Sequence, residues 1–210
     1  MKKNFEKILK TVLNIAILMS FIACGNNASA VNNQNNANIE NIKKENRKVL
    51  VVYFSQTGTT EGVAKIIGKV TGADFFKLEP KNPYSTADLD WTDKNSRVSK
   101  EHENIDKINI VLKNVKADNF ESYDTVFIGY PIWWGKASWV VYDFIQKNDF
   151  TGKTVIPFYT SMSTNSEDSE KKLEKIAGTG KWIKGQRFPS NYNREDVKKW
   201  VVGLNIGDKN

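Results

Sequence analysis

The sequence predicts an α/β fold in which a parallel sheet carries helices on both faces. Short apolar runs rich in β-branched and aromatic residues alternate with segments whose apolar side chains recur at helical spacing. The runs at 49–54 and 125–128 are almost entirely apolar, which is typical of strands buried on both faces of a parallel sheet. Connections between parallel strands are right-handed crossovers, so we expect helices on both faces of the sheet.

The remaining elements follow from local patterns along the chain. Gly72 ends the first helix, whose apolar residues between 63 and 70 recur at helical spacing. Pro80 stops the second strand, because proline cannot donate to a strand ladder. The expected strands span 49–54, 74–78, 125–128, 154–159 and 182–188, and two further helices span 138–148 and 166–177.

An insertion and a closing helix complete the expected elements. Residues 81–120 form a polar insertion between the second and third strands, with a helix expected within 93–106. The closing helix follows the last strand, and either Asn191 or Asn193 can cap its first turn. Length and apolar content are enough for one core, and hence for one folded domain.

A hydroxyl-rich turn joins the first strand to the first helix. Its place at the carboxyl end of a strand directs unpaired backbone N–H groups, the positive end of the helix dipole and the four hydroxyls of the turn at one spot. Gly58 lets the backbone turn without a clash at Cβ. The turn has no Lys or Arg, so it suits a phosphate bound by neutral donors; a plain helix cap is the alternative. This hydroxyl turn comprises Ser55, Gln56, Thr57, Gly58, Thr59 and Thr60.

Two adjacent tryptophans follow the third strand, between a proline and a glycine. Two neighbouring rings in such a loop cannot both face a core, and large apolar rings are rarely exposed unless a flat ligand covers them. The alternative is a hydrophobic loop in which one ring packs on a neighbouring helix. The segment comprises Tyr130, Pro131, Ile132, Trp133, Trp134 and Gly135.

With both motifs in this order, residues 48–202 resemble the flavodoxin family, and within it the group with a Gly-Tyr-Pro-Ile-Trp-Trp loop preceded by a long insertion. The resemblance implies a flavodoxin-like three-layer sandwich around a five-stranded parallel sheet of order 2-1-3-4-5. Flavodoxin is itself a standard example of a ligand bound where the strand order reverses. The resemblance implies FMN as cofactor, with its phosphate on the hydroxyl turn and Trp133 or Trp134 against its isoalloxazine ring. It assigns a third contact to Ser161, Met162 and Ser163, where the group usually has a glycine-rich loop.

The first 47 residues predict export and a lipid anchor. Residues 1–23 have a lysine-rich start and an apolar stretch that is too short for a transmembrane helix and fits a signal peptide. Cys24, the sole cysteine, follows Phe-Ile-Ala and resembles the lipobox cysteine of bacterial lipoproteins, whose thiol is lipidated. The alternative is an ordinary cleaved signal with an incidental cysteine. The Asn-rich residues 24–47 are expected to tether an FMN-binding domain over 48–206.

Net charge and side-chain chemistry indicate which classes of binding partner the protein could have. The formal net charge is +7, and removal of residues 1–23, which hold four lysines and one glutamate, leaves about +4. A basic surface favours anionic lipid or acidic partners, although a Lys- and Asn-biased proteome explains it equally well. No aromatic–basic interleaving indicates nucleic-acid binding. The sole histidine, His102, is expected to be a surface residue paired with Glu101 and Glu103.

The sequence therefore predicts an extracytoplasmic, membrane-anchored bacterial lipoprotein that binds FMN. No metal-ligand spacing or Ser/His/Asp arrangement is visible, so a bound cofactor would do the chemistry. Three functions stay open. One is an electron carrier with a redox partner protein. The second is an FMN-dependent NAD(P)H:quinone-type oxidoreductase acting on a small quinone-like acceptor. The third is a flavin-binding protein without turnover.

Overall fold

The computed structural model describes residues 48–162 and 167–206. The predicted signal peptide, Cys24 and the tether lie outside the described residues and stay predictions. Within the described ranges, no helix is long and apolar enough to cross a membrane.

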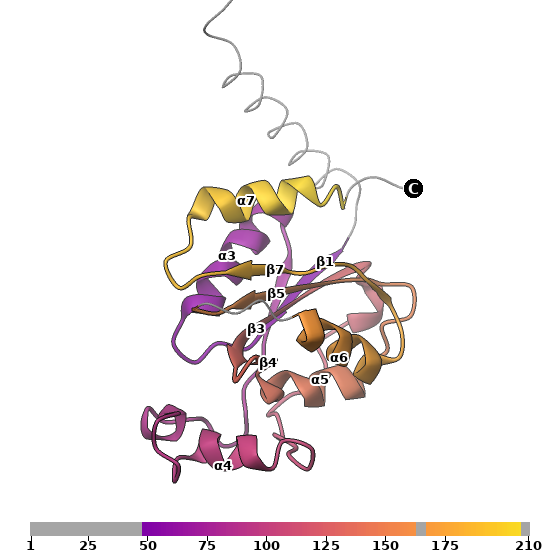
Figure 1. Ribbon diagram of the computed structural model, residues 1–210. Helices are drawn as coiled ribbons and strands as arrows, with labels where there is room; N and C mark the ends of the chain where they lie inside the picture. Colours follow the sequence, from indigo (N-terminus) through magenta and orange to yellow (C-terminus); the bar gives the residue numbers. More distant parts are fainter. Residues whose placement is uncertain (1–47, 163–166, 207–210) are drawn as a thin grey trace, which may run out of the picture. The chain divides into compact units, whose positions relative to one another are not determined.

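The sheet is parallel along its main path, with strand order β2-β1-β3-β5-β6. Figure 1 labels β1, β3 and β5 of this path. A further strand, β7, also pairs with β5 in parallel, and the short β4 pairs with β3 in the antiparallel direction. The strands are β1 (Val49–Tyr53), β2 (Asp74–Lys77), β3 (Thr125–Trp133), β4 (Lys136–Ala137), β5 (Thr154–Thr160), β6 (Lys181–Trp182) and β7 (Gln186–Phe188).

The predicted single strand over 182–188 is wrong, because it is broken into β6 and β7. Trp182 pairs with Val155 and Gln186 with Phe158, so the outer strand carries one residue more than β5 between the two pairs. Pro157 has no N–H to offer across this gap. The amide of Gly185 instead donates to Glu170 Oε2 at 2.8 Å. With β4 added, the described sheet has seven strands and not the expected five, although its main path still runs outward from β1 in two directions.

Helices cover both faces of the sheet, as expected for a three-layer sandwich (Figure 1). Helices α3 and α7 pack against each other on one face, and α5 and α6 cover the other. Gly72, with φ +72°, ends α3 as predicted, and the Asn193 side chain accepts from the Glu195 amide, which decides between the two candidate caps of α7. The helices are α3 (Thr59–Thr71), α5 (Tyr142–Lys147), α6 (Glu167–Ala177) and α7 (Arg194–Gly203), with a 3₁₀ turn η3 (Trp139–Val141) before α5.

Two apolar clusters lie on the two sides of the sheet. Alternate residues of β1 separate between them: Leu50 and Val52 face α5, while Val49 and Val51 face α3 and α7. Every residue of β1 is buried, as the continuous apolar run predicted. The two-sided burial fixes the register of β1 between its neighbours, and this places the residues after it at the edge of the sheet.

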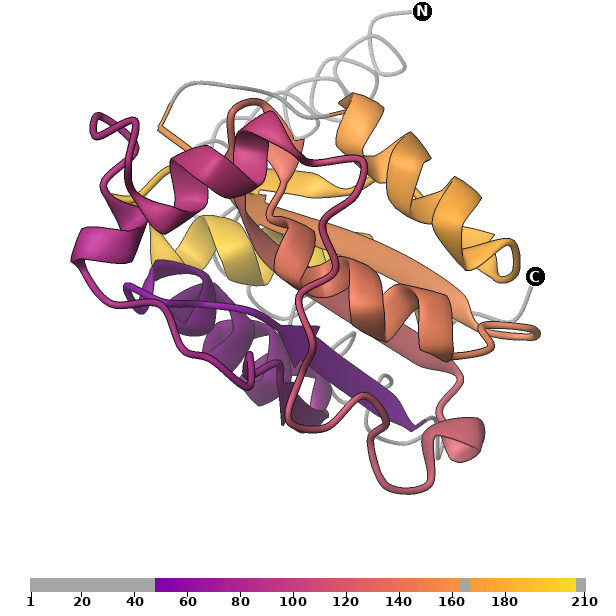
Figure 2. The same cartoon turned by 90° about the horizontal axis from the view of Figure 1, so that it is seen from below.

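The insertion folds over the α5 side of the sheet. It contains α4 (Arg97–Glu103), which lies inside the range predicted for a helix, and the 3₁₀ turns η1 (Ala87–Leu89) and η2 (Phe120–Ser122). The Ser96 side chain caps α4 by accepting from the Ser99 amide. The insertion thereby contributes an ordered helix beside the carboxyl edge of the sheet, where the candidate site lies (Figure 2).

Candidate functional site

Three connections meet at the carboxyl ends of β1, β3 and β5. These strands are adjacent and parallel, so the segments that follow them leave the same edge of the sheet. The first and third connections touch directly, since the hydroxyl oxygens of Thr60 and Thr160 are 2.8 Å apart. The segments that the two sequence motifs and the third contact identified are therefore neighbours in space.

The hydroxyl turn exposes the start of α3. Gly58 has φ +90°, a left-handed conformation that side-chain-bearing residues rarely adopt, and a Cβ at this position would meet no atom within 4 Å. The first hydrogen bond of the helix runs from the Gly62 amide to the Gly58 carbonyl, at 2.9 Å. The amides of Thr59, Thr60 and Glu61 precede it and have no intrahelical acceptor. No side chain caps α3, so the alternative of a plain helix cap does not describe this turn.

The side chains of the hydroxyl turn have different roles. Thr57 is exposed and Thr59 is half-buried, so both hydroxyls remain accessible. The prediction that all the hydroxyls of the turn point to one spot is wrong for Thr60, because it is buried against Thr160. Gln56 donates from Nε2 to the Tyr84 carbonyl at 2.7 Å, which ties the turn to the insertion.

Ser55 presents a buried hydroxyl at the start of the turn. It is 7% exposed, and its Oγ has no hydrogen-bond partner among the described residues. A buried polar group without a partner costs free energy, so such groups in folded proteins normally have a partner that completes them. Together with the unpaired amides that follow, this hydroxyl fits an anionic oxygen ligand at the turn.

The tryptophan segment is a strand and a tight hairpin, and not the loop that we expected. Strand β3 continues through Trp133, and β4 pairs back on it, with Trp133 opposite Lys136. The two turn residues, Trp134 and Gly135, have φ +47° and +72°. Two left-handed residues in a two-residue connection are the geometry that suits the twist of a β-hairpin. We call residues 130–137 the tryptophan hairpin.

The two indoles lie in different environments. Trp133 packs edge-on against Phe54, Tyr84 and Trp139, with ring centroids 4.9–5.7 Å apart, so the alternative of a packed ring is correct for it. Trp134 is 39% exposed at the tip of the hairpin. It is the indole that retains open surface for a planar ligand.

His102 lies against Trp134, so the prediction of a surface histidine paired with carboxylates is wrong. Its imidazole stacks on the indole with centroids 4.6 Å apart and planes 10° from parallel. Burial and the nearby Lys136 ammonium lower the pKa of His102 from its usual value, while Glu103 acts in the opposite direction. Burial and Lys136 thus favour the neutral form of the imidazole.

Glu101 turns inward and ties the insertion to Trp139 of η3, the turn that follows the hairpin. It is 7% exposed, and its carboxylate accepts from Tyr84 Oη at 2.6 Å and Trp139 Nε1 at 2.7 Å. The Arg97 Nε donates to the other oxygen at 2.7 Å, and its guanidinium lies 3.9 Å from the centre of the Tyr84 ring. Burial and the Glu101 carboxylate also raise the pKa of Tyr84. This charge-assisted network holds α4, and with it His102, in a fixed position.

The strand residues of the hairpin before the two tryptophans are Tyr130, Pro131 and Ile132. The Tyr130 side chain is fully buried and stacks on Tyr159 at 5.8 Å, and burial raises its pKa well above the usual range. Tyr130 therefore cannot present its ring to a ligand, contrary to its place in the predicted binding set. The Pro131 carbonyl accepts from the Ser138 amide, while Ile132 is half-buried on β3.

The third connection begins with Ser161 and Met162, and Ser163 lies outside the described residues. Met162 is 90% exposed. Arg187 of β7 was not among the predicted site residues, and its guanidinium donates to Ser161 Oγ and to the carbonyls of Ser161 and Met162. Only the pairing of β7 with β5 brings this arginine to the connection, and no local pattern marks it.

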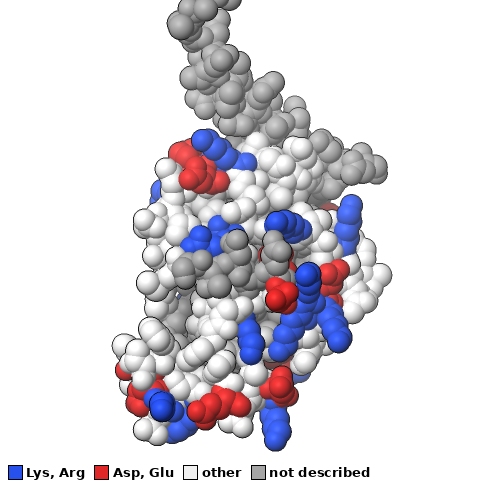
Figure 3. All heavy atoms as spheres, viewed as in Figure 1, with Lys and Arg blue, Asp and Glu red and all other residues white. Residues whose placement is uncertain are grey.

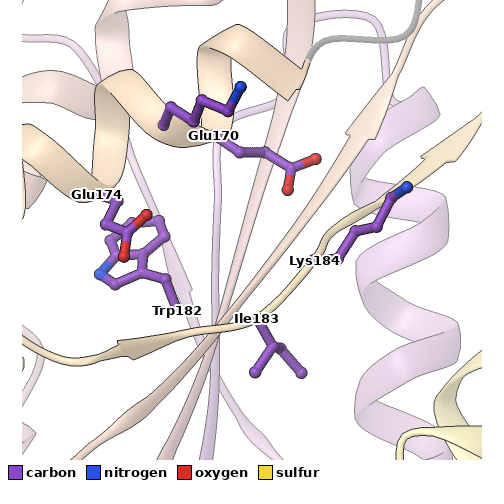
Figure 4. Close-up of a pocket in the computed structure, with 6 residues that line it drawn as sticks. Glu170, Glu174, Trp182, Ile183 and Lys184 are labelled. Atoms are coloured by element: carbon purple, nitrogen blue, oxygen red, sulfur yellow. The ribbon is translucent and has the colours of Figure 1, made fainter.

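Other charged features lie away from the three connections. A hollow of about 250 Å³ lies between α6 and the break in the outer strand, where Trp182 and Lys184 face Glu170 and Glu174 (Figure 4). Basic and acidic side chains are interspersed on the face that carries α6, without a large patch of one sign (Figure 3). In the part of the chain that the structure describes, no group of three or more His, Cys, Asp or Glu residues could hold a metal ion.

The fold is that of a doubly wound α/β protein, and the three connections form a candidate ligand site at the carboxyl edge of its sheet. The sequence model of the Flavodoxin family matches residues 48–204, and the chain belongs to this family. No curated protein matches the sequence significantly.

Solved structures agree with this membership. A provisionally assigned flavoprotein from Bacteroides uniformis is 41% identical, with a TM-score of 0.68 over 74% of this chain and 97% of its own. A similarly assigned flavoprotein from Bacteroides eggerthii is 38% identical, with a TM-score of 0.69 over 77% of this chain and 99% of its own. A Lactobacillus acidophilus flavoprotein, solved in complex with FMN, shares the fold at 22% identity, with a TM-score of 0.53 over 73% of this chain and 98% of its own.

Proposed function

We propose that this flavodoxin-family protein binds FMN non-covalently and transfers electrons at the extracytoplasmic face of a membrane. The observation that carries the proposal is the uncapped start of α3, which offers free amides and threonine hydroxyls at the same edge of the sheet as an exposed indole. Phosphate and a flat aromatic ring are the two chemical parts of FMN that these groups match. The FMN complex of the Lactobacillus acidophilus flavoprotein, which shares this fold, supports the same cofactor.

The residues at the phosphate end would bind through neutral donors. These donors would be the amides of 59–61 at the positive end of α3, together with the hydroxyls of Thr57 and Thr59, whose side chains are not buried. Hydrogen bonds to a charged phosphate are about twice as strong as those between neutral groups. The buried Ser55 hydroxyl, which has no partner among the described residues, would gain one there.

The residues at the ring end would orient the cofactor and exclude water. Trp134 offers its open surface to a flat ring, while the half-buried Trp133 packs on the buried rings of Tyr84 and Phe54. When bound, FMN supplies the redox chemistry, because none of the protein's own groups at the site is an electron carrier. The protein would hold the flavin ring at the carboxyl edge of the sheet and determine the charge around it.

One observation favours a second function, that of an FMN-dependent NAD(P)H:quinone-type oxidoreductase. The Glu101 network fixes α4 beside the hairpin, so that His102 and Trp134 form a rigid aromatic wall. A rigid wall is better suited to a small planar acceptor than to a broad protein surface. A carrier would instead need a redox partner protein.

Membrane attachment through Cys24 belongs to the same proposal. The lipobox-like sequence and the Asn-rich residues after it support a lipid anchor that places the FMN domain outside the cytoplasm. Expression of the full chain and of Cys24→Ser in a bacterial host, followed by membrane fractionation, tests it. We expect the variant to leave the membrane fraction; complete retention there counts against a lipid anchor.

The first experiment is to purify the full chain in detergent and record its visible spectrum. We expect flavin bands, and denaturant should release FMN that chromatography identifies. Steady-state reduction with NADH or NADPH and a quinone then separates the two functions, since only the oxidoreductase turns over without a partner protein. A colourless protein that takes up no added FMN excludes both functions, and bound FMN that cannot be reduced leaves a flavin-binding role without turnover.

A further inference from the structure

The planar guanidinium of Arg187 forms three hydrogen bonds with the start of the third connection, an arrangement that we call the Arg187 grip. Its Nε donates to Ser161 Oγ at 2.8 Å, and one terminal nitrogen donates to the carbonyls of Ser161 and Met162 at 3.1 and 2.8 Å. Three hydrogen bonds from one planar guanidinium fix the directions of the Ser161 and Met162 carbonyls. The backbone at 161–162 is therefore held by a side chain from the neighbouring strand.

The fold places this grip at the candidate site. Arg187 lies opposite Tyr159 in the β5–β7 ladder, and the Ser161 amide continues the ladder by donating to the Phe188 carbonyl at 3.2 Å. Thr160, one residue before Ser161, touches Thr60 of the hydroxyl turn. A ligand that spans the first and third connections thus lies beside residues that Arg187 holds.

Among the described residues, no carboxylate forms an ion pair with Arg187. Its three acceptors are two carbonyls and a hydroxyl. The hydroxyl turn contains no Lys or Arg, so Arg187 adds a positive charge that the first connection lacks. An arginine that is half-buried and has no counter-ion within the described ranges favours an anionic ligand nearby.

We propose that Arg187 is a positioning residue for FMN, which holds the 161–162 backbone against the bound cofactor and favours its reduced form through its charge. The inference rests on the proposed binding of FMN. Reduction of FMN by two electrons and one proton leaves one negative charge on the ring system, which a nearby cation stabilises. Arg187 therefore acts on both the affinity and the reduction potential.

The test uses the full chain in detergent and the variants Arg187→Met and Arg187→Lys. The lysine keeps the charge but cannot form the planar three-bond grip. Arg194→Met, which removes an exposed arginine at the start of α7, is the matched control. Circular dichroism first establishes that each variant is folded. Ser161→Ala, which removes only the hydroxyl acceptor, gives a milder second variant should Arg187→Met fail to fold.

Two quantities are measured: the affinities for FMN and riboflavin by flavin fluorescence, and the potential of bound FMN at low salt. We expect Arg187→Met to weaken FMN by about tenfold or more, as for the loss of one hydrogen bond to a charged group. Riboflavin should weaken less, because it lacks the phosphate charge that Arg187 also attracts. Its preference for reduced over oxidised FMN should fall by about threefold, as for a unit charge about 6 Å away in a water-like dielectric. Arg187→Lys should restore this preference but not the affinity, and Ser161→Ala should weaken both ligands by a few fold.

Other results overturn the inference. If the affinities of Arg187→Met lie within twofold of wild type, Arg187 has no role in FMN binding, although the protein still binds FMN. A loss of affinity at an unchanged potential would mean loop packing alone. A wild-type chain that binds no FMN would instead overturn the proposed function and, with it, this inference.

Discussion

The two sides of the site are built in contrasting ways. The hydroxyl turn is made by one continuous segment, and its donors are the backbone amides at the start of α3. The ring side is assembled from separate parts: the hairpin supplies Trp134, the insertion supplies His102, and Glu101 bonds them through Trp139. A local segment can bind phosphate wherever a strand leads into a helix, whereas the ring side depends on long-range contacts that single substitutions can disconnect.

The largest effect should come from the local side. Replacing Thr57 and Thr59 with alanine removes two hydrogen bonds to a charged phosphate, each worth about 1.5–3 kcal/mol. FMN affinity should fall by about 3–6 kcal/mol while riboflavin affinity stays unchanged, because riboflavin lacks the phosphate. Fluorescence titration with both ligands measures this, and an unaltered FMN affinity would show that the turn does not bind the phosphate.

The assembled side should respond to Glu101→Leu. The substitution leaves Tyr84 Oη and Trp139 Nε1 buried without their acceptor and separates Arg97 from its partner. Breaking a buried charged network costs about 3–5 kcal/mol, so we expect that loss in the free energy of unfolding. Glu103→Leu, on the exposed side of the same helix, is the matched control and should change little in urea unfolding. Equal losses in both variants would mean that the network does not anchor the insertion.

Substitution of Lys136 tests how charge on the ring side affects the reduction potential of bound FMN. It lies opposite Trp133 in the hairpin and is close enough to lower the pKa of His102. A positive charge at about 6 Å in water-like surroundings stabilises the negative charge of reduced FMN by about 0.7 kcal/mol. Lys136→Glu should therefore lower the potential of the second electron in a spectroelectrochemical titration. If the potential does not move at low salt, Lys136 points its charge into solvent.

The smallest effect is a pH dependence carried by His102. Its pKa lies below the ordinary value of 6.5, because burial and Lys136 disfavour the imidazolium, with Glu103 opposing them. The unfolded chain therefore binds the proton more readily, and the stabilisation present above about pH 6.5 is lost as the pH falls through the folded pKa. We expect the slope of unfolding free energy between pH 5 and 7 to be smaller in His102→Phe, which keeps a flat ring on Trp134. Identical slopes would exclude His102 as the titrating group.

The same contrast explains what the sequence could predict. The apolar run at 49–54 and the turn after it carry their signals in neighbouring residues, so the strand, the α3 start and the Gly72 end of that helix were predictable. The extension of β3 through Trp133 needs the partner strand β4, which no local pattern marks. The break between β6 and β7 depends on Glu170, and the grip on Ser161 depends on Arg187, each contributed by a different element.

The break in the outer strand also bears on how copies of this protein behave when crowded together. A sheet edge with a long row of open backbone groups invites a second chain to pair with it and begin aggregation. Here the edge consists of strands of two and three residues, and the amide of Gly185 between them is already bonded to Glu170. Copies of the chain that meet at high concentration find no continuous ladder to extend at this interrupted edge.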